Sequence, residues 1–381
     1  MTRALDHIYG DTLVVRPPVP VTVNKAGANY KSEVTHTSYS PRSAYDEWLA
    51  ICDAIVACGG DALVQFEDAD EAFLDAPGLE VDPAGDVRPE GSREVLGNLE
   101  DILTGRVFTA NGPWVVARDR KLCAAMPHML PHRQAEAPYY RDLLARVADA
   151  CGLELELLEN PHRWEGMADV AAVGERVVLT YAVPGHYDEG LSPKSRRSSR
   201  EGVAFAADVA GVPEEARIYA ELVYPHFHGD TVHFGARPAR GEPALVQYPG
   251  GLWGDGASRI REDLGADRIV PTGRIDAADN YATNSRQVRG GVLIPEHASA
   301  EFEAAMEGLG LICHRLRLYE LFGKAGGGPA CATLYLPENL DIPARFPHRY
   351  SVSREEIRAR RDRVPDRVTV DPGYFEDKSR G

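Results

Sequence analysis

The stretch Gly326–Pro337 reads GGGPACATLYLP. Three glycines and a proline lead to a single cysteine, Cys331, and the apolar run that follows is predicted to be a strand. Glycines let a chain bend without Cβ clashes and let another group approach the backbone closely. A buried, inert cysteine is the commoner situation. A nucleophilic thiol needs an imidazole or a cation beside it, so other parts of the chain must supply one.

Polar residues also interrupt apolar runs at three other places. They are FTANG, with Asn111; RWEGMAD, with Glu165 and Asp169; and YPHFHGDTVHF, with His228 and Asp230. Polar groups between buried strands are costly unless they are used. Asn-Gly is also an ordinary turn dipeptide, and two carboxylates four residues apart can simply be solvated. Taken alone, the first two stretches therefore remain ambiguous.

The histidine-rich stretch is more specific. Alternate residues of a strand share a face, so His226, His228 and Asp230 are expected to point the same way. A histidine beside a carboxylate acts as a general base or binds a metal, although a histidine-rich surface strand is an alternative. With a later histidine such as His348, the pair would form a two-His, one-carboxylate iron site. That interpretation leaves Cys331 without a role and expects continuous strands.

Composition narrows the classes of partner. The chain has 381 residues, a formal net charge of -16 and 44% hydrophobic residues. An acidic chain repels nucleic acid and anionic membranes, and no apolar stretch reaches membrane-spanning length. The six cysteines form no CxxC pair and resemble neither a zinc site nor a disulfide framework. We therefore expect a cytoplasmic protein without nucleic-acid or membrane partners.

Short predicted strands and helices alternate along the chain, in units of about 50–60 residues. No GxGxxG or GxxxxGK[ST] motif is present, so no nucleotide cofactor is expected. The expected organisation is an N-terminal arm with an early strand, one catalytic domain that carries an acidic insertion, and a charged C-terminal helix and tail. Their residue ranges are 1–22, 23–345, 67–103 and 346–381, respectively.

Taken in order, VFTAN, WEGMAD, RSSREG, HGDT, YATN and GGGPACATLYL resemble the strand-end motifs of the guanidino-group-modifying superfamily. Its members include arginine deiminases, arginine dihydrolases, dimethylarginine dimethylaminohydrolases and arginine amidinotransferases. The resemblance covers roughly residues 22–337. It implies an α/β fold, the pentein propeller, in which five ββαβ-type units surround a central channel. The active site of this fold lies where the strand ends meet.

The resemblance also implies a covalent mechanism. Cys331 would attack the guanidinium carbon of an arginine-like substrate, while Asp230 pairs with the guanidinium. His228 would protonate the leaving amine and then activate the next nucleophile, and Glu165 would orient His228. No metal or cofactor is implied, because the positive charge of the substrate itself lowers the pKa of the thiol.

Five further residues are expected to contact substrate. Asn111 occupies a position that is an aspartate in arginine deiminases, and FTAN resembles the dihydrolase branch. Asn24 matches a second asparagine of that branch. Arg133 and Arg197 match basic positions that hold the substrate α-carboxylate, for which a bidentate pair is the expected geometry. Asp169 completes the set.

The resemblance thus predicts a hydrolase that acts on the guanidino group of arginine or an arginine derivative. An amidinotransferase with the same Cys, His and Glu is the alternative, since it differs only in admitting an amine and excluding water. A non-catalytic binding module of the same fold is less consistent with the sequence, because Cys331, His228 and Glu165 are all present. The expected partner is a small guanidino compound, and a homodimer is possible.

Overall fold

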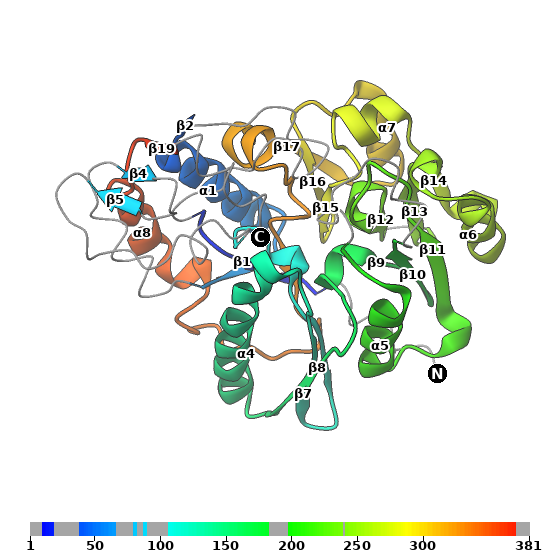
Figure 1. Cartoon of the computed structure of the whole chain (residues 1–381), viewed down its shortest axis with the longest axis horizontal. Coiled ribbons are helices and arrows are strands. Elements are labelled where there is room, and N and C mark those ends of the chain that lie inside the picture. Colours follow the sequence, from blue (N-terminus) through cyan, green and yellow to red (C-terminus); the bar gives the residue numbers. More distant parts are fainter. Residues whose placement is uncertain are drawn as a thin grey trace.

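The computed structural model describes residues 10–18, 38–65, 79–81, 87–89, 106–182, 197–238 and 241–370. The strands of these segments form five three-stranded sheets and one four-stranded sheet. Figure 1 shows the three-stranded sheets following one another around the molecule, with α4, α5, α6 and α7 at its periphery.

Four of the three-stranded sheets share one order along the chain: two strands, a helix and a third strand. They consist of β6 (Trp114–Arg118), β7 (Lys121–Met126), α4 (Ala137–Cys151) and β8 (Glu154–Glu159); β9 (Val170–Val173), β10 (Arg176–Tyr181), α5 (Arg200–Ala210) and β11 (Arg217–Glu221); β12 (His233–Ala236), β13 (Ala244–Gln247), α6 (Gly256–Leu264) and β14 (Ile269–Pro271); and β15 (Arg286–Val288), β16 (Gly291–Pro295), α7 (Ala300–Gly308) and β17 (Ile312–Leu316). In each unit the first pair of strands is antiparallel and the second pair is parallel. The predicted α/β fold of repeated ββαβ units is therefore confirmed.

The fifth unit joins the two ends of the described chain. Strand β18 (Leu334–Tyr335), just after Cys331, pairs antiparallel with β1 (Thr12–Val15). Strand β1 in turn pairs parallel with β3 (Asp61–Val64), across helix α1 (Pro41–Ala57). The early strand that we expected within an N-terminal arm thus lies at the centre of a sheet.

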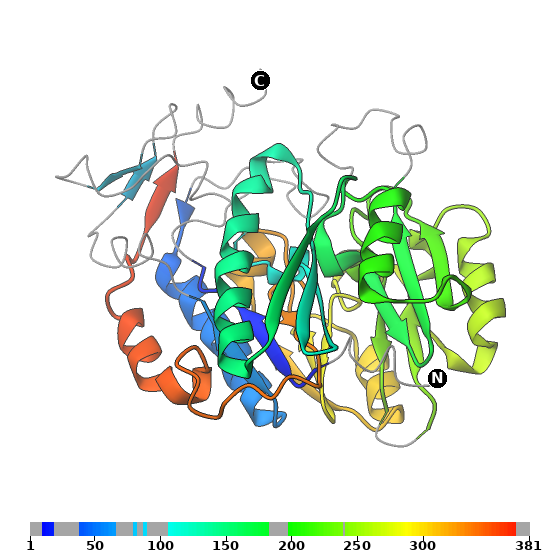
Figure 2. The same cartoon turned by 90° about the horizontal axis from the view of Figure 1, so that it is seen from below.

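The four-stranded sheet lies on the opposite side of the molecule from α6 (Figures 1 and 2). Its strands are β2 (Ser38–Tyr39), β19 (Val368–Val370), β4 (Leu79–Val81) and β5 (Val87–Pro89). Of the predicted insertion at 67–103, only β4 and β5 are among the described residues. The charged C-terminal helix is α8 (Tyr350–Arg361), and it is tied to α1 by a hydrogen bond of 3.0 Å from Tyr45 Oη to the Ile357 carbonyl.

Short helical turns connect these elements. The 3-10 turns are Thr109–Asn111, Pro131–Glu136, Gly166–Asp169, Glu214–Ala216, Gly229–Thr231, Pro249–Gly251 and Ala266–Arg268, and the π-helical turns are Ile275–Asp279 and Tyr319–Lys324. The turn at Gly229–Thr231 replaces part of a predicted strand, whereas the turn at Thr109–Asn111 ends at the Asn-Gly dipeptide that is typical of turns. The segment before Gly112 turns at Thr109–Asn111, and the histidine-rich segment turns at Gly229–Thr231, so β12 begins only at His233.

Side chains in both turns donate hydrogen bonds to backbone carbonyls. The Thr109 hydroxyl donates to the Val14 carbonyl at 2.9 Å, and the Thr231 hydroxyl donates to the His228 carbonyl at 2.7 Å. Such side-chain bonds to backbone compete with strand pairing. The strand expected for the histidine-rich segment is therefore wrong at Gly229–Thr231, where the backbone turns.

Helix α1 begins where the sequence signals a start. Ser40 accepts a hydrogen bond from the Ser43 amide at 3.2 Å, and Pro41 occupies the first helical position. A proline is tolerated there because its missing N–H would be unsatisfied in any case. The inward face of α1 carries Trp48, Ile51 and Ile55, which are fully buried.

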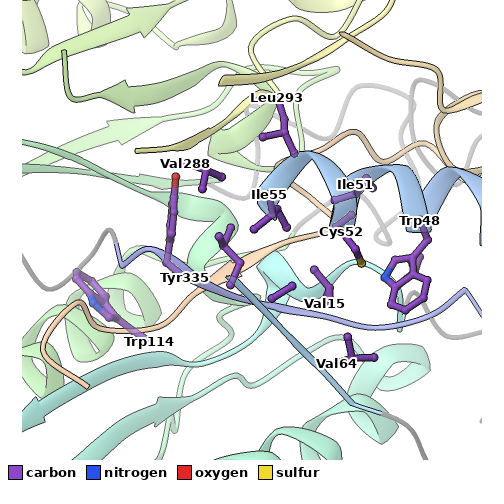
Figure 3. Close-up of a cluster of buried hydrophobic side chains, with 14 of the residues drawn as sticks. Val15, Trp48, Ile51, Cys52, Ile55, Val64, Trp114, Val288, Leu293 and Tyr335 are labelled. Atoms are coloured by element: carbon purple, nitrogen blue, oxygen red, sulfur yellow. The ribbon is translucent and has the colours of Figure 1, made fainter. Parts of the chain in front are cut away.

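This face of α1 packs on strands from two units (Figure 3). Ile51 and Ile55 lie in one core cluster with Val15 of β1 and Val64 of β3, and with Leu293 of β16. Each fully buried Val, Leu or Ile side chain contributes about 1.5–3 kcal/mol to folding. Helix α1 therefore joins the sheet that follows Cys331 to its neighbour.

We predict that Trp48→Ala lowers the free energy of unfolding by about 3–5 kcal/mol, because it leaves a cavity in this cluster. Urea unfolding followed by far-ultraviolet circular dichroism measures the change. Val352→Ala is the control: that side chain is 49% exposed, so its effect should stay within about 0.5 kcal/mol. Equal effects of the two substitutions would contradict the role given to α1.

Candidate active site

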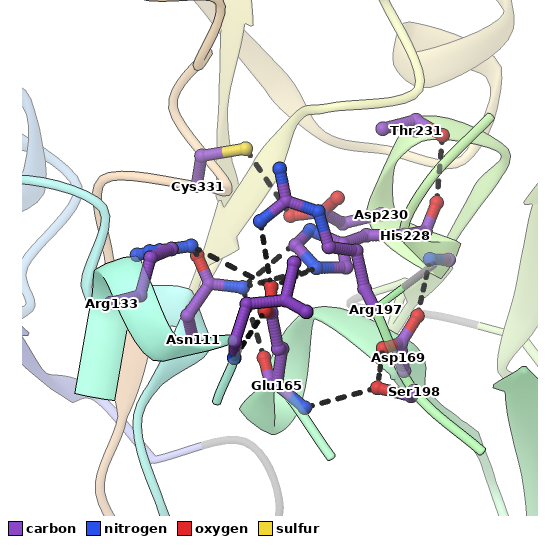
Figure 4. Close-up of polar contacts among 12 residues, drawn as sticks. Asn111, Arg133, Glu165, Asp169, Arg197, Ser198, His228, Asp230, Thr231 and Cys331 are labelled. Atoms are coloured by element: carbon purple, nitrogen blue, oxygen red, sulfur yellow. Dashed lines mark hydrogen bonds and ion pairs between the residues drawn. The ribbon is translucent and has the colours of Figure 1, made fainter. Parts of the chain in front are cut away.

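Each unit contributes polar side chains just before its first strand. Asn111 precedes β6, Glu165 lies in the turn before β9, and His228 precedes β12; Asn284 and Cys331 precede β15 and β18. In Figure 4 the side chains of four of these residues point toward one another: Asn111, Glu165, His228 and Cys331. The repeated fold therefore gathers residues that lie far apart in the sequence into one cluster.

Cys331 is 6% exposed, and its sulfur contacts two side chains. Its thiol donates to Asp230 Oδ2 at 3.4 Å, and Asn284 Nδ2 donates to the sulfur at 3.1 Å. Burial, reinforced by the charge of Asp230, raises the pKa of the Cys331 thiol well above its ordinary value. The sulfur of the unliganded protein is therefore a protonated thiol at neutral pH. All six cysteines are free.

The glycines before Cys331 make room for protein side chains. A Cβ on Gly327 would come within 2.1 Å of the Phe108 ring, and one on Gly328 within 2.7 Å of Asn284 Oδ1. Gly326 has a φ of +81°, which favours glycine. We expected these glycines to leave space for a ligand, but Phe108 and Asn284 fill the space at Gly327 and Gly328.

Glu165 and His228 form a buried pair. His228 Nε2 lies 3.1 Å from Glu165 Oε2, and neither side chain is more than 2% exposed. Burial alone would raise the pKa of Glu165, but the charge of Arg197, the hydrogen bond from His228 and the charge of Arg133 together hold it well below its ordinary value. Glu165 is therefore a carboxylate that orients the imidazole through Nε2.

Asn111 and Arg133 lie against this pair. Asn111 Nδ2 donates to the Glu165 carbonyl at 2.9 Å and lies 3.4 and 3.5 Å from the two ring nitrogens of His228. Arg133 donates to Asn111 Oδ1 at 2.7 Å. The bidentate partner of Arg133 is Glu136, through two bonds of 2.7 Å. A carboxylate of the protein thus occupies the face of Arg133 that we expected to bind a ligand.

Arg197 reaches the same carboxylate from the other side. Its Nη1 donates to Glu165 Oε2 at 2.9 Å, and its guanidinium carbon lies 5.6 Å from the centre of the Phe227 ring. Arg197 Nε is buried and has no hydrogen-bond partner among the described residues. The positive charge of Arg197 therefore compensates the negative charge of Glu165, and its Nε–H has no acceptor among the described residues.

Asp230 is the second carboxylate of the site. It is 7% exposed, and burial raises its pKa to about 6 despite the hydrogen bond from Cys331. Its Oδ1 is buried without a hydrogen-bond partner among the described residues. A buried acceptor without a donor is destabilising, so this oxygen is suited to receive a donor from a bound cation.

Asp169 holds the loop that carries His228 and Asp230. Its carboxylate accepts hydrogen bonds from the Gly229 amide at 2.8 Å, the Thr180 hydroxyl at 3.1 Å and the Ser198 hydroxyl at 2.5 Å. Burial raises its pKa to about 6. A Cβ on Gly229 would lie 2.2 Å from Thr180 Oγ1, so a leucine or any larger residue does not fit there. Gly229 therefore lets the loop pack tightly.

The other candidate histidines, His226 and His348, have different hydrogen-bond partners. His226 Nδ1 is 3.0 Å from the Thr231 hydroxyl, and His348 Nδ1 is 3.1 Å from the Val64 carbonyl. His233 is buried, which lowers its pKa to about 3. The alternative iron site required His348 beside His228, and these two side chains do not meet. In the part of the chain that the structure describes, no three His, Cys, Asp or Glu side chains form a metal-binding group.

Two residues of the site escaped the sequence analysis. Ser198 accepts from the Glu165 amide at 3.0 Å and donates to Asp169, and Asn284 contacts the sulfur. Both lie in motifs that the sequence does carry, RSSREG and YATN. The repeat itself could have indicated Asn284, since each other unit supplies a polar residue at the matching position. Asn24, by contrast, lies outside the described residues.

No helix among the described residues is long and apolar enough to cross a membrane.

No protein-family model matches the chain, and no curated protein matches it. Solved structures do match. The N-terminal domain of ArgZ, an arginine dihydrolase from the ornithine–ammonia cycle in cyanobacteria, superimposes with a TM-score of 0.61 at 17% identity, covering 86% of this chain and 97% of that one.

Two other matches agree. AgrE, in a complex with ornithine and NAD+, gives a TM-score of 0.61 at 19% identity, over 87% of this chain and 40% of that one. DDAH from Pseudomonas aeruginosa, bound to citrulline, gives 0.56 at 15% identity, over 86% of this chain and 99% of that one. At these identities the likeness concerns the fold. The chain has the pentein fold of the guanidino-modifying enzymes that its motifs resemble.

Proposed function

We propose that this protein is a hydrolase that acts on the guanidino group of arginine or an arginine derivative through a covalent adduct on Cys331. The observation that carries the proposal is the pairing of the buried Cys331 thiol with a carboxylate, Asp230, that has an unpartnered oxygen. The buried His228–Glu165 pair completes the set of groups that such a reaction needs.

Asp230 binds the substrate cation. A guanidinium donates two parallel N–H bonds to a carboxylate, and Asp230 Oδ1 is available for one of them. Pairing brings the guanidinium carbon close to the sulfur, which lies 3.4 Å from Oδ2. The positive charge also offsets the effect of Asp230 on the thiol, so the thiol pKa falls when substrate binds.

The reaction then proceeds in two halves. The thiol proton passes to His228, and the sulfur forms a bond to the guanidinium carbon. The bond from that carbon to one nitrogen breaks, and the departing nitrogen takes the proton from His228 as its electron pair leaves. Water gives a proton to His228 and bonds to the carbon, the sulfur–carbon bond breaks, and the proton returns to the sulfur. One amine and a ureido product result. In the dihydrolase outcome the sulfur attacks the ureido carbon in a second round, a second ammonia leaves, and water hydrolyses the carbamoyl adduct to a carbamate, which breaks down to ornithine and carbon dioxide.

His228 is suited to these transfers. Its Nε2 is held by Glu165, so Nδ1 exchanges protons with the reacting atoms. Arg133 and Arg197 keep Glu165 ionised, which stabilises the imidazolium after each transfer. We propose this as their role in the free protein; a contact of either arginine with the substrate α-carboxylate remains a prediction. Asp169 acts as a positioning residue for the loop.

Three comparisons support the class of substrate. The ArgZ domain was crystallised with its substrate, AgrE with ornithine and DDAH with citrulline. An Asn-to-Ser variant of the ArgZ domain is covalently bound to a reaction intermediate, which supports an adduct on Cys331 here. Asn111 and the FTAN motif favour the dihydrolase outcome, in which ornithine is formed. An amidinotransferase would use the same residues and transfer the amidino group to an amine.

We predict that the purified protein converts L-arginine and two waters to ornithine, two ammonia molecules and carbon dioxide, and mass spectrometry of the products detects the ornithine. Cys331→Ala should reduce turnover to background, because no other group supplies the nucleophile. Cys313→Ala should retain the activity of the unmodified protein. Citrulline as the end product would indicate deiminase chemistry, and turnover only with an added amine would favour the amidinotransferase. Normal turnover by Cys331→Ala would refute the mechanism.

A second prediction concerns pH. The pKa of Asp230 is raised to about 6, so its carboxylate is charged above pH 6 and protonated below it. Binding of L-arginine to Cys331→Ser should therefore weaken below pH 6, approaching about tenfold per pH unit. Isothermal titration calorimetry over a pH series measures this dependence.

The control separates Asp230 from Asp169, whose pKa is also raised to about 6. Asp230→Asn in the same background should bind weakly and lose the dependence near pH 6. If the dependence persists in that variant, Asp169 or another group causes it, and the assignment of Asp230 fails.

A further inference from the structure

Asn284 lies in the segment between the turn Ile275–Asp279 and β15, and it is fully buried. Its side chain contacts Cys331 at both ends. Oδ1 accepts a hydrogen bond from the Cys331 amide at 3.1 Å, and Nδ2 donates to the Cys331 sulfur at 3.1 Å. Nδ2 also donates to the Asp230 carbonyl at 3.2 Å. One amide group therefore connects the thiol to the loop that carries Asp230.

These contacts fix the orientation of the amide. Oδ1 faces a backbone N–H, so Nδ2 must be the atom that faces the sulfur, and its two hydrogens go to the sulfur and to the Asp230 carbonyl. Aspartate has the same shape but no hydrogen to donate. Gly328 leaves the space for this arrangement, because a Cβ there would lie 2.7 Å from Asn284 Oδ1.

The sulfur therefore lies between groups of opposite effect. Asp230 accepts the thiol hydrogen and raises the pKa of the thiol, whereas the N–H of Asn284 lowers it. When a guanidinium engages Asp230, the thiol hydrogen is lost and the sulfur becomes a buried anion. The Asn284 N–H is already aimed at that anion and needs no rearrangement. Such a preorganised donor stabilises charge that develops during reaction.

We propose that Asn284 is a catalytic residue, which donates Nδ2–H to the Cys331 sulfur and stabilises the thiolate that attacks the guanidinium carbon. The inference rests on the proposed function in one respect, that Cys331 is the nucleophile. The segment that carries Cys331 also has an anchor that is independent of this side chain. The Ala330 amide donates to the backbone carbonyl of Asn284 at 3.1 Å, and that bond does not depend on the side chain.

The test compares Asn284→Asp with the unmodified protein. At a fixed pH below the thiol pKa, the rate of alkylation by iodoacetamide follows the fraction of thiolate. Mass spectrometry of the peptide that contains Cys331 measures this rate without any substrate. We expect the rate to fall by about tenfold or more in Asn284→Asp, because a donor is replaced by a second carboxylate. Turnover of L-arginine should fall by about 10²-fold in kcat, with a smaller change in KM.

Asn339→Asp is the matched control. Asn339 donates to the Ala117 carbonyl through its own Nδ2, in a loop outside the site, so the alkylation rate and kcat should not change. Asn284→Ala adds no charge and serves if Asn284→Asp does not fold. Its alkylation rate should fall less than that of Asn284→Asp. A rise in that rate would mean that access, and not ionisation, limits the reaction, and would contradict the proposal.

The outcomes also separate this inference from the proposed function. An unchanged alkylation rate in both variants at position 284 overturns the role of Asn284, even if L-arginine is hydrolysed. Slower alkylation with unchanged kcat overturns it as well, since the contact would then have no part in the reaction. If neither L-arginine nor a methylated arginine is turned over by the unmodified protein, the proposed function fails, and the role of Asn284 fails with it.

Discussion

The pairing of β18 with β1 is the constraint on which the rest of the structure depends. Leu13 pairs with Tyr335 and Val14 with Leu334, so a strand near the start of the chain completes the unit that begins with Cys331. The sulfur lies three residues before this pairing and is held on its other side by Asn284. Without β1, the segment of Cys331 would have no strand to anchor it, and the four other units would surround an incomplete site.

Buried charge organises the site that this closure creates. Glu165 is surrounded by donors and remains ionised, whereas burial raises the pKa values of Asp230 and Asp169 to about 6. The three carboxylates therefore differ in how readily they take up a proton. One is a permanent anion that orients His228, and Asp230 is left short of donors beside the thiol. A buried carboxylate of that kind favours a cationic ligand over a neutral one, because only a cation compensates its loss of hydration.

The sequence predicted much of this arrangement, for physical reasons that can be traced to single elements. The alternation of short strands and helices depends on the periodicity of neighbouring residues only, and the four ββαβ units confirm it. The turn at Gly229–Thr231 was predicted as a strand, because the hydrogen bond from the Thr231 hydroxyl to the His228 carbonyl leaves no trace in a hydropathy pattern.

The site shows the same division. Cys331, His228 and Glu165 have chemically distinctive side chains, and the motifs predicted roles for them. Asn284 has an ordinary side chain, and it is distinguished only by its contact with a residue in another unit. The partner of Arg133 was likewise missed, since Glu136 lies three residues away, at a spacing that is common on helical surfaces. Contacts across units depend on the closed fold, which no local pattern specifies.

The split fifth unit has a consequence for biosynthesis. Strand β1 leaves the ribosome before its two partners and can pair with β3 soon after that strand emerges, but its other edge must wait for β18, about 320 residues later along the chain. During that interval the nascent protein carries an open, apolar strand edge, the kind of surface that pairs with other chains. Cys331 lies three residues before β18, so a chain that ends before Cys331 lacks this thiol and also keeps the exposed edge.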